Sequence, residues 1–222
     1  MIPNTELSDE KAALIRLLMD TQVLQFGDFT LKSGRRSPYF FNLGAINSGS
    51  GISALGSAYA RCILGTPVAF SSVFGPAYKG IPIAVATAEA LARQGRDVGW
   101  TFNRKEAKDH GEGGLFVGAP LTGDVVLVDD VLTAGTAVRE AAALIAAANA
   151  NLAAIFITMD RQEIVDPASG ATAVQVLQEE LGVAVKSLLN LQDVIHYLDS
   201  NSLPDNHRVD ELKRYQAAHC AR

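Results

Sequence analysis

The chain is short of cysteine, of aromatic residues and of long apolar stretches. Its two cysteines, Cys62 and Cys220, follow neither a CxxC pattern nor any metal-ligand spacing, so we expect free thiols and a reducing compartment. No stretch approaches the roughly 18 uncharged apolar residues of a membrane-spanning helix. The N-terminus has acids where a signal peptide has a basic segment. These absences predict a cytoplasmic protein with no membrane partner.

An excess of positive charge is also missing. The net charge is −5, which gives no overall attraction to nucleic acid, and we predict no such partner. Hydrophobic residues make up 48% of the chain but aromatics only 7%, so Ala, Val, Leu and Ile must fill the core. The length of 222 residues suits one α/β domain spanning 1–222.

Short apolar runs alternate with helical patterns along the chain. Ser8 is a good N-cap for a first helix, and two short strands follow within 25–43. The later strands are expected at 68–74, 98–102, 125–128, 152–159 and 183–188. Helices are expected at 51–64, 79–93, 136–148, 173–181 and within 190–220. We expect residues 103–118, which are polar and glycine-rich, to form neither element. The alternation predicts an α/β fold with a central parallel sheet flanked by helices.

The most specific pattern begins where the apolar run 125–128 ends. Two carboxylates, Asp129 and Asp130, are followed by a small, hydroxyl-rich turn and then a helix. Such a turn can offer successive backbone N–H groups and a helix N-terminus to a monophosphate, with Gly135 allowing close approach or a positive φ. The cradle would comprise Val131, Leu132, Thr133, Ala134, Gly135, Thr136 and Ala137. The plainer alternative is a solvated strand exit followed by a helix cap.

The string 125–137 resembles the signature with which type I phosphoribosyltransferases bind phosphoribosyl pyrophosphate (PRPP). A Walker A motif is absent from the sequence. Residues 49–54 match a dinucleotide fingerprint, but no acid occurs between Gly51 and Glu89, where that motif expects one. The resemblance implies the type I phosphoribosyltransferase fold, with a small N-terminal hood formed by residues 1–45 and the C-terminal segment.

A second motif lies at 103–114, after the expected strand 98–102. It contains three cations, a histidine and three glycines, a composition that could neutralise a departing anion and could also be an ordinary exposed loop. The string from Arg104 to Gly114 resembles the catalytic loop of orotate phosphoribosyltransferases. That resemblance implies PRPP-binding roles for Arg104, Lys105, Lys108 and His110.

Three further segments agree with this family. The resemblance implies that Lys32, Tyr78 and Lys79 also bind PRPP. It implies that Phe40, Phe41, Thr133 and Arg161 bind orotate. Without it, core packing would be the expected role of the two phenylalanines, and a surface salt bridge with Asp160 or Glu163 that of Arg161.

The resemblance implies transfer of the phosphoribosyl group of PRPP to orotate, giving orotidine 5′-monophosphate and pyrophosphate in pyrimidine biosynthesis. The implied catalytic residues are Lys108, His110, Asp129 and Asp130. Mg²⁺ is the implied cofactor, held mainly by substrate and without a dedicated protein site. A homodimer with shared active sites is also implied. Transfer to another base, or a PRPP-binding regulator on the same fold, are the alternatives.

Overall fold

A six-stranded sheet forms the centre of the computed structural model, which describes residues 7–31, 34–108, 114–201 and 206–221. Neighbouring strands are parallel except for the last pair, β4 and β5, which is antiparallel. In order across the sheet the strands are β10 (Ala184–Asn190), β7 (Asn151–Asp160), β6 (Asp124–Val131), β3 (Ser72–Gly75), β4 (Gly99–Lys108) and β5 (Gly114–Gly118). The α/β fold is confirmed, but the sheet is mixed and not wholly parallel.

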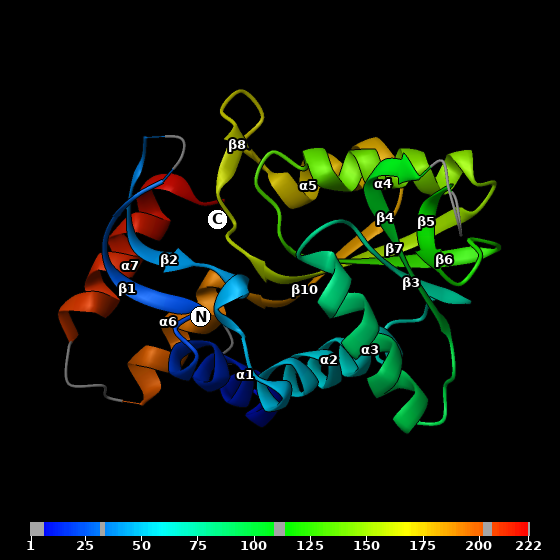
Figure 1. Cartoon of the computed structure of the whole chain (residues 1–222). Helices are drawn as coiled ribbons and strands as arrows, with labels where there is room; N and C mark the ends of the chain where they lie inside the picture. The colour runs from blue at the N-terminus through cyan, green and yellow to red at the C-terminus, as the bar shows by residue number, and fades with distance from the viewer. Residues whose placement is uncertain (1–6, 32–33, 109–113, 202–205, 222) are drawn as a thin grey trace.

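Helices cover both faces of this sheet (Figure 1). The helices α4 (Thr136–Ala147) and α5 (Ala173–Leu181) lie on one face, and α2 (Gly49–Leu64) and α3 (Gly80–Arg93) lie on the other. Alternate side chains of β6 supply the two cores: Val126 and Val128 join one cluster, and Val125 and Leu127 join the other. Burial on both faces explains why this strand is a continuous apolar run.

The two terminal regions pack together beside the sheet (Figure 1). A hairpin of β1 (Leu24–Thr30) and β2 (Arg36–Phe41) packs against α7 (Asn206–His219), where Tyr39 and Tyr215 meet edge to face with ring centroids 5.8 Å apart. The helices α1 (Asp9–Asp20) and α6 (Leu191–Ser200) complete this part of the molecule. The Ser8 hydroxyl caps α1 by accepting from the backbone N–H of Lys11, as predicted.

Two small elements connect these parts. The 3-10 helix η1 (Leu43–Ala45) leads from β2 to α2. A two-stranded ribbon of β8 (Ile164–Asp166) and β9 (Ala171–Thr172) precedes α5. No helix within the described ranges is long and apolar enough to cross a membrane.

The prediction for 103–118 was wrong. β4 continues to Lys108, and β5 begins at Gly114 and pairs with it at the edge of the sheet. The outer part of β4 is polar because an edge ribbon is ordered by backbone hydrogen bonds and its side chains need no burial, and the apolar run of β5 is only three residues long, 115–117, between two glycines. The strand expected at 68–74 is also shorter than predicted, since β3 begins only at Ser72.

Candidate active site

The carboxyl ends of three adjacent strands meet at one edge of the sheet. Phe74 of β3 pairs with Leu127 of β6, and Val131 of β6 pairs with Met159 of β7. The loops that leave these strands therefore emerge side by side, as expected for ligand sites of parallel α/β sheets. They carry the three motifs that sequence analysis placed near Lys79, Asp130 and Arg161.

The two acids of the signature are buried at the end of β6. Asp129 is 8% exposed and Asp130 is 7% exposed. The backbone N–H of Asp130 donates to a carboxylate oxygen of Asp129 at 2.9 Å, and that of Val131 donates to Asp130 at 2.8 Å. Burial, followed by the nearby charge of Asp130, raises the pKa of Asp129 to about 7. These carboxyls are therefore not the solvated strand exit of the plainer alternative.

Tyr59, which sequence analysis missed, supports this end of β6 from α2. Its fully buried hydroxyl donates to the backbone oxygen of Asp129 at 2.6 Å and lies 2.7 Å from the Thr158 hydroxyl on β7. The contact fixes the backbone from which the two carboxylates project. No local pattern signals this role, because Tyr59 belongs to the apolar face of α2 and meets β6 only in the folded chain.

Lys79 joins the β3 loop to the acidic pair. Its ammonium donates to a carboxylate oxygen of Asp130 at 2.6 Å and still keeps half of its surface exposed. The backbone turns sharply here, and a side chain on Gly75 would collide with the carbonyl oxygen of Gly80. The small residues at both positions therefore allow α3 to start close to β3 and to present Lys79 at the site.

The predicted phosphate cradle occupies the turn from β6 into α4. Gly135 has φ +73° and caps α4, a backbone conformation that favours glycine. Thr133 and Thr136 are exposed, whereas Leu132 is buried in the core beneath them. Both threonines beside the N-terminus of α4 are therefore accessible from solvent, as a monophosphate site requires.

The basic segment is described only in part. Arg104 donates from a guanidinium nitrogen to the carbonyl oxygen of Gly114, 3.2 Å away on β5. The ammonium of Lys105 lies 4.7 Å from the ring centroid of Tyr78, a residue of the β3 loop that is 66% exposed. Lys108 ends β4, but its side chain lies outside the described residues, as do the whole of His110 and Lys32.

The two phenylalanines of β2 point to opposite faces of the hairpin. Phe41 is 7% exposed and belongs to the core, as the packing alternative holds. Phe40 is 38% exposed and stacks on Phe29 with ring centroids 5.5 Å apart. Phe40 is therefore the accessible aromatic side chain of the pair.

Arg161 follows β7 and lies under the hairpin. Its guanidinium sits 4.6 Å above the ring centroid of Tyr39, and its Nε donates to Glu163 at 2.8 Å. Nη2 is 2.6 Å from the same oxygen, an ion-pair contact that is not a well-aligned hydrogen bond. The salt bridge with Glu163 exists, but it is largely buried, with side-chain exposures of 11% and 17%, and so is not the surface pair of the alternative.

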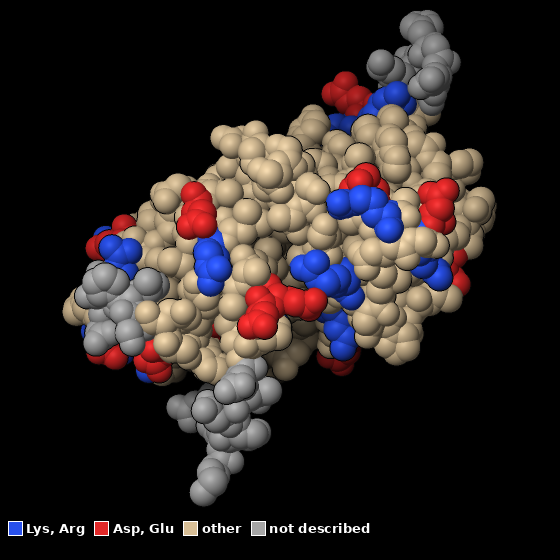
Figure 2. Space-filling model, turned by 90° about the horizontal axis from the view of Figure 1, so that it is seen from below, with Lys and Arg blue, Asp and Glu red and all other residues tan. Residues whose placement is uncertain are grey.

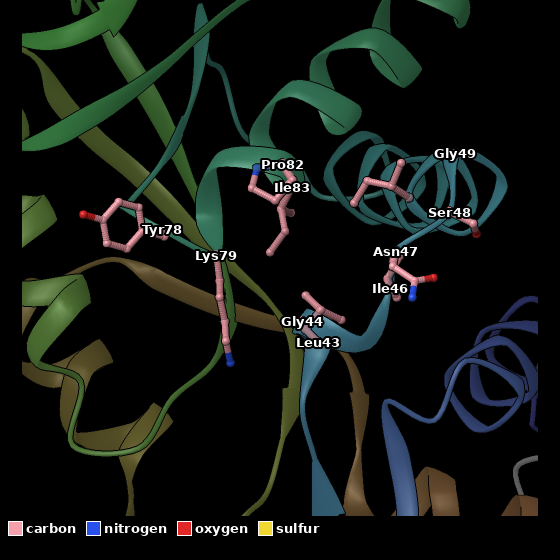
Figure 3. A pocket seen from close by; sticks show the side chains of 11 residues that line it. Leu43, Gly44, Ile46, Asn47, Ser48, Gly49, Tyr78, Lys79, Pro82 and Ile83 are labelled. Carbon is pink, nitrogen blue, oxygen red and sulfur yellow. The ribbon is translucent and has the colours of Figure 1, made fainter.

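A cavity of about 530 Å³ opens beside Lys79 (Figure 3). Tyr78 and Lys79 stand on one side of it, and residues from η1 and the start of α2 stand on the other. Most of the remaining wall is apolar, with Ile52, Pro82 and Ile83 contributing. The charged edge of the candidate site thus continues into a less polar hollow.

Known proteins match both the sequence and this arrangement. Residues 54–180 match the phosphoribosyl transferase domain family. The chain is 52% identical to an orotate phosphoribosyltransferase of Stutzerimonas stutzeri over 185 residues, covering 83% of this chain and 86% of that protein. It is 49% identical to that of Cupriavidus metallidurans over 207 residues, covering 92% of each.

A solved structure agrees with these relatives. The orotate phosphoribosyltransferase of Francisella tularensis superposes with a TM-score of 0.83 at 37% identity, covering 94% of this chain and all of the other. These matches cover most of the chain, and the family match over 54–180 spans the acidic pair and the turn that follows it. The chain belongs to the orotate phosphoribosyltransferases.

Proposed function

We propose that the edge formed by β3, β6 and β7 carries the activity of this family. The enzyme transfers the phosphoribosyl group of PRPP to orotate, giving orotidine 5′-monophosphate and pyrophosphate in de novo pyrimidine biosynthesis. One observation supports the assignment to this edge: the Lys79 ammonium lies 2.6 Å from the Asp130 carboxylate, and Asp130 precedes in sequence the turn that leads to the N-terminus of α4. This contact supports the assignment because a cation and two carboxylates lie together at the strand end that leads into the turn proposed as the phosphate cradle.

The acidic pair suits the ribose of PRPP. Carboxylates at Asp129 and Asp130 can accept hydrogen bonds from two ribose hydroxyls, and their charge favours the cationic sugar that forms as the glycosidic bond changes. The cradle 131–137 suits the 5′-phosphate through backbone N–H groups and the hydroxyls of Thr133 and Thr136. The enzyme needs no nucleophilic side chain, because orotate itself attacks the anomeric carbon when it is aligned with it.

Pyrophosphate leaves with negative charge that cations must stabilise. Lys79, Arg104 and Lys105 are the described cations placed for this role, and Tyr78 would line their site. We propose the same role for Lys32, Lys108 and His110, for which only the sequence motifs provide support. Each such contact acts most strongly in the transition state, where the charge is largest.

The orotate site is proposed at the hairpin. Arg161 offers a guanidinium to the orotate carboxylate, Thr133 a hydroxyl to its ring, and the segment of Phe40 and Phe41 a surface against its face. The exposed ring of Phe40 supports stacking of that side chain on orotate. Because the side chain of Phe41 is buried, that residue would contact orotate through its backbone.

Mg²⁺ is proposed as the cofactor, bound mainly through oxygens of PRPP. The residues fit a nearby cation, because Asp129 and Asp130 are adjacent carboxyls at the end of β6; burial first, and then the charge of Asp130, raises the pKa of Asp129, and positive charge nearby would lower it again. Asp129 and Asp130 would adjoin it through ribose hydroxyls. When bound, the ion withdraws charge from the departing pyrophosphate.

A homodimer with shared active sites is also proposed. Figure 2 views the molecule from the side of α2 and α3 and shows a broad uncharged area broken by small groups of both signs. Leu64 of α2 is 43% exposed and Val85 of α3 is 38% exposed, which suits burial against a second copy. The contact of Lys105 with Tyr78 of its own chain favours the alternative that the basic segment serves its own subunit.

A cytoplasmic location completes the proposal. It is supported by the two cysteines, which are both free in the structure, the usual state in a reducing compartment. The mixed charges on the face of Figure 2 offer no broad basic surface to nucleic acid there.

The test is the loss of orotate absorbance on adding PRPP and Mg²⁺, with hypoxanthine, adenine and uracil as competing bases. We expect turnover with orotate alone. Turnover with a purine would support a transferase for another base. PRPP binding without turnover of any base would support the regulator.

A further inference from the structure

One largely buried carboxylate, that of Glu163, connects three parts of the chain. It accepts hydrogen bonds from Nε of Arg161 at 2.8 Å, from a guanidinium nitrogen of Arg35 at 3.1 Å and from the hydroxyl of Tyr215 at 2.7 Å. These partners come from the β7 loop, the turn between β1 and β2, and α7 respectively. Glu163 therefore ties the N-terminal hairpin and the C-terminal helix to the residue proposed to bind orotate.

Two guanidiniums share this carboxylate, because Arg35 and Arg161 both donate to Glu163. The buried Nη2 of Arg161 lies 2.6 Å from a Glu163 oxygen but makes no well-aligned hydrogen bond in the described part of the chain. A second guanidinium on one carboxylate and a poorly aligned buried donor together suit an anionic ligand with a carboxylate acceptor.

The backbone around Arg161 is held as firmly as its side chain. The carbonyl oxygen of Arg161 accepts from the thiol of Cys220 at 3.5 Å, and that of Gln162 accepts from the backbone N–H of Ala221 at 2.9 Å. Glu163 and Cys220 also form an antiparallel bridge. The C-terminal residues thus run beside the β7 loop and fix its path.

We propose that Glu163 is a positioning residue for the orotate site, which holds the Arg161 guanidinium in place and couples it to α7 through Tyr215. The inference rests on the proposed role of Arg161 in binding orotate. An arginine side chain loses much rotamer freedom when it is fixed, and a partner that fixes it before the ligand arrives improves affinity. Glu163 supplies that fixing through a charge-assisted hydrogen bond, and Tyr215 in turn holds Glu163.

Two variants test the inference by steady-state kinetics. Glu163→Gln keeps the size of the side chain but removes its charge, and we expect the Michaelis constant for orotate to rise about tenfold, with that for PRPP nearly unchanged. Tyr215→Phe keeps the ring against Tyr39 and removes only the hydroxyl, so a smaller rise of about threefold is expected. Glu89→Gln, which breaks the exposed pair with Arg93 on α3, is the matched control and should change neither constant.

A double-mutant cycle separates this inference from the proposed function. If Glu163 acts through Arg161, Glu163→Gln should add little to the orotate constant of Arg161→Ala. An unchanged orotate constant in Arg161→Ala would overturn the role of Arg161 itself. A normal orotate constant in Glu163→Gln, beside a raised one in Arg161→Ala, would overturn the positioning role alone.

The same kinetics exclude a merely structural effect. Should Glu163→Gln not fold, Tyr215→Phe carries the test alone, because it disturbs no charge and little packing. Equal increases for orotate and PRPP in that variant would mean a general loss of structure and would also overturn the inference.

Discussion

Asp129 is an acid whose folded environment opposes its ionisation, and this predicts a distinctive dependence of stability on pH. Its pKa is raised from 3.8 to about 7, so the folded state holds a proton there that the unfolded state has already released. The free energy of unfolding should therefore fall as pH rises from 4 to 7, by about 1.4 kcal/mol per unit from this group, and level off above. Asp129→Asn, which is neutral throughout, should lose this component.

The measurement is urea denaturation of wild type and Asp129→Asn at several values between pH 5 and pH 8. The stability of wild type relative to the variant is expected to decline across the range up to about 7. Parallel curves for the two proteins would show that Asp129 ionises normally and that its burial has little effect.

A substitution at Asp130 tests whether the charge of this side chain matters apart from its shape. Asp130→Asn keeps an oxygen for the backbone N–H of Val131 but loses the charge opposite Lys79 and the ribose. We expect turnover to fall by roughly 10²–10³, as for loss of a group that stabilises transition-state charge. Thermal melting measured beside the kinetics should stay close to wild type. A far lower melting temperature would mean that the acid is mainly structural.

Local conformations that follow from a short pattern were predictable, and contacts between distant parts of the chain were not. The acidic pair and Gly135 follow directly from a strand, a turn and a helix in sequence. The pairing of Glu163 with Arg161 was among the alternatives, since the two are close in sequence. The contacts of Tyr59 with β6 and of Glu163 with Arg35 and Tyr215 form only in the tertiary fold, and no spacing along the chain indicates them.

The close junction of β3 and α3 can be tested with a single methyl group. In Gly75→Ala the new Cβ would meet the backbone of Gly80 and lie 2.8 Å from the Cβ of Ala84, so α3 has to shift. We expect a loss of about 1–3 kcal/mol in unfolding free energy. PRPP binding should also weaken, because Lys79 moves with α3.

Chemical denaturation and calorimetric titration with PRPP would measure the two effects. Gly49→Ala is the control for stability, since a Cβ there meets nothing within 4 Å at the start of α2. A variant at Gly75 as stable as that control would contradict the proposed tight junction.

Strands buried on both sides were easier to predict than those at the edge. β6 and β7 are recognisable in the sequence as continuous apolar runs, because helices cover both of their faces. The outer half of β4 is polar, and β5 offers only three half-buried apolar residues between two glycines, of which Phe116 packs against Phe74. Hydrophobic patterns in a sequence reflect burial, so a ribbon with few buried side chains gives only a weak pattern.

The proposed sharing of sites between subunits predicts recovery of activity when two inactive variants are mixed. Lys108→Ala should reduce turnover by roughly 10²–10³ through loss of loop charge, and Asp130→Asn disables the cradle side. If the loop acts on the partner, each mixed dimer has one intact site and one with both lesions. Random exchange makes about half of the dimers mixed, so activity should return to about a quarter of wild type.

Orotate turnover after confirmed subunit exchange, for example by mass spectrometry of tagged chains, provides the measurement. A loop that serves its own subunit leaves one lesion in every site, and mixing then restores nothing. That outcome would favour the contact between Lys105 and Tyr78 as the working arrangement.

The packing of the hairpin against α7 also sets the order in which a newly made chain can mature. The hairpin of β1 and β2 is synthesised before the strands of the sheet, but its partner α7 is synthesised after them. The strands that carry the acidic pair and the cradle all precede α7 in the chain, so they can begin to pair before it is made. The hydroxyl of Tyr215 can reach Glu163 only after α7 has been synthesised. The half of the site proposed for orotate is therefore completed after the half proposed for PRPP.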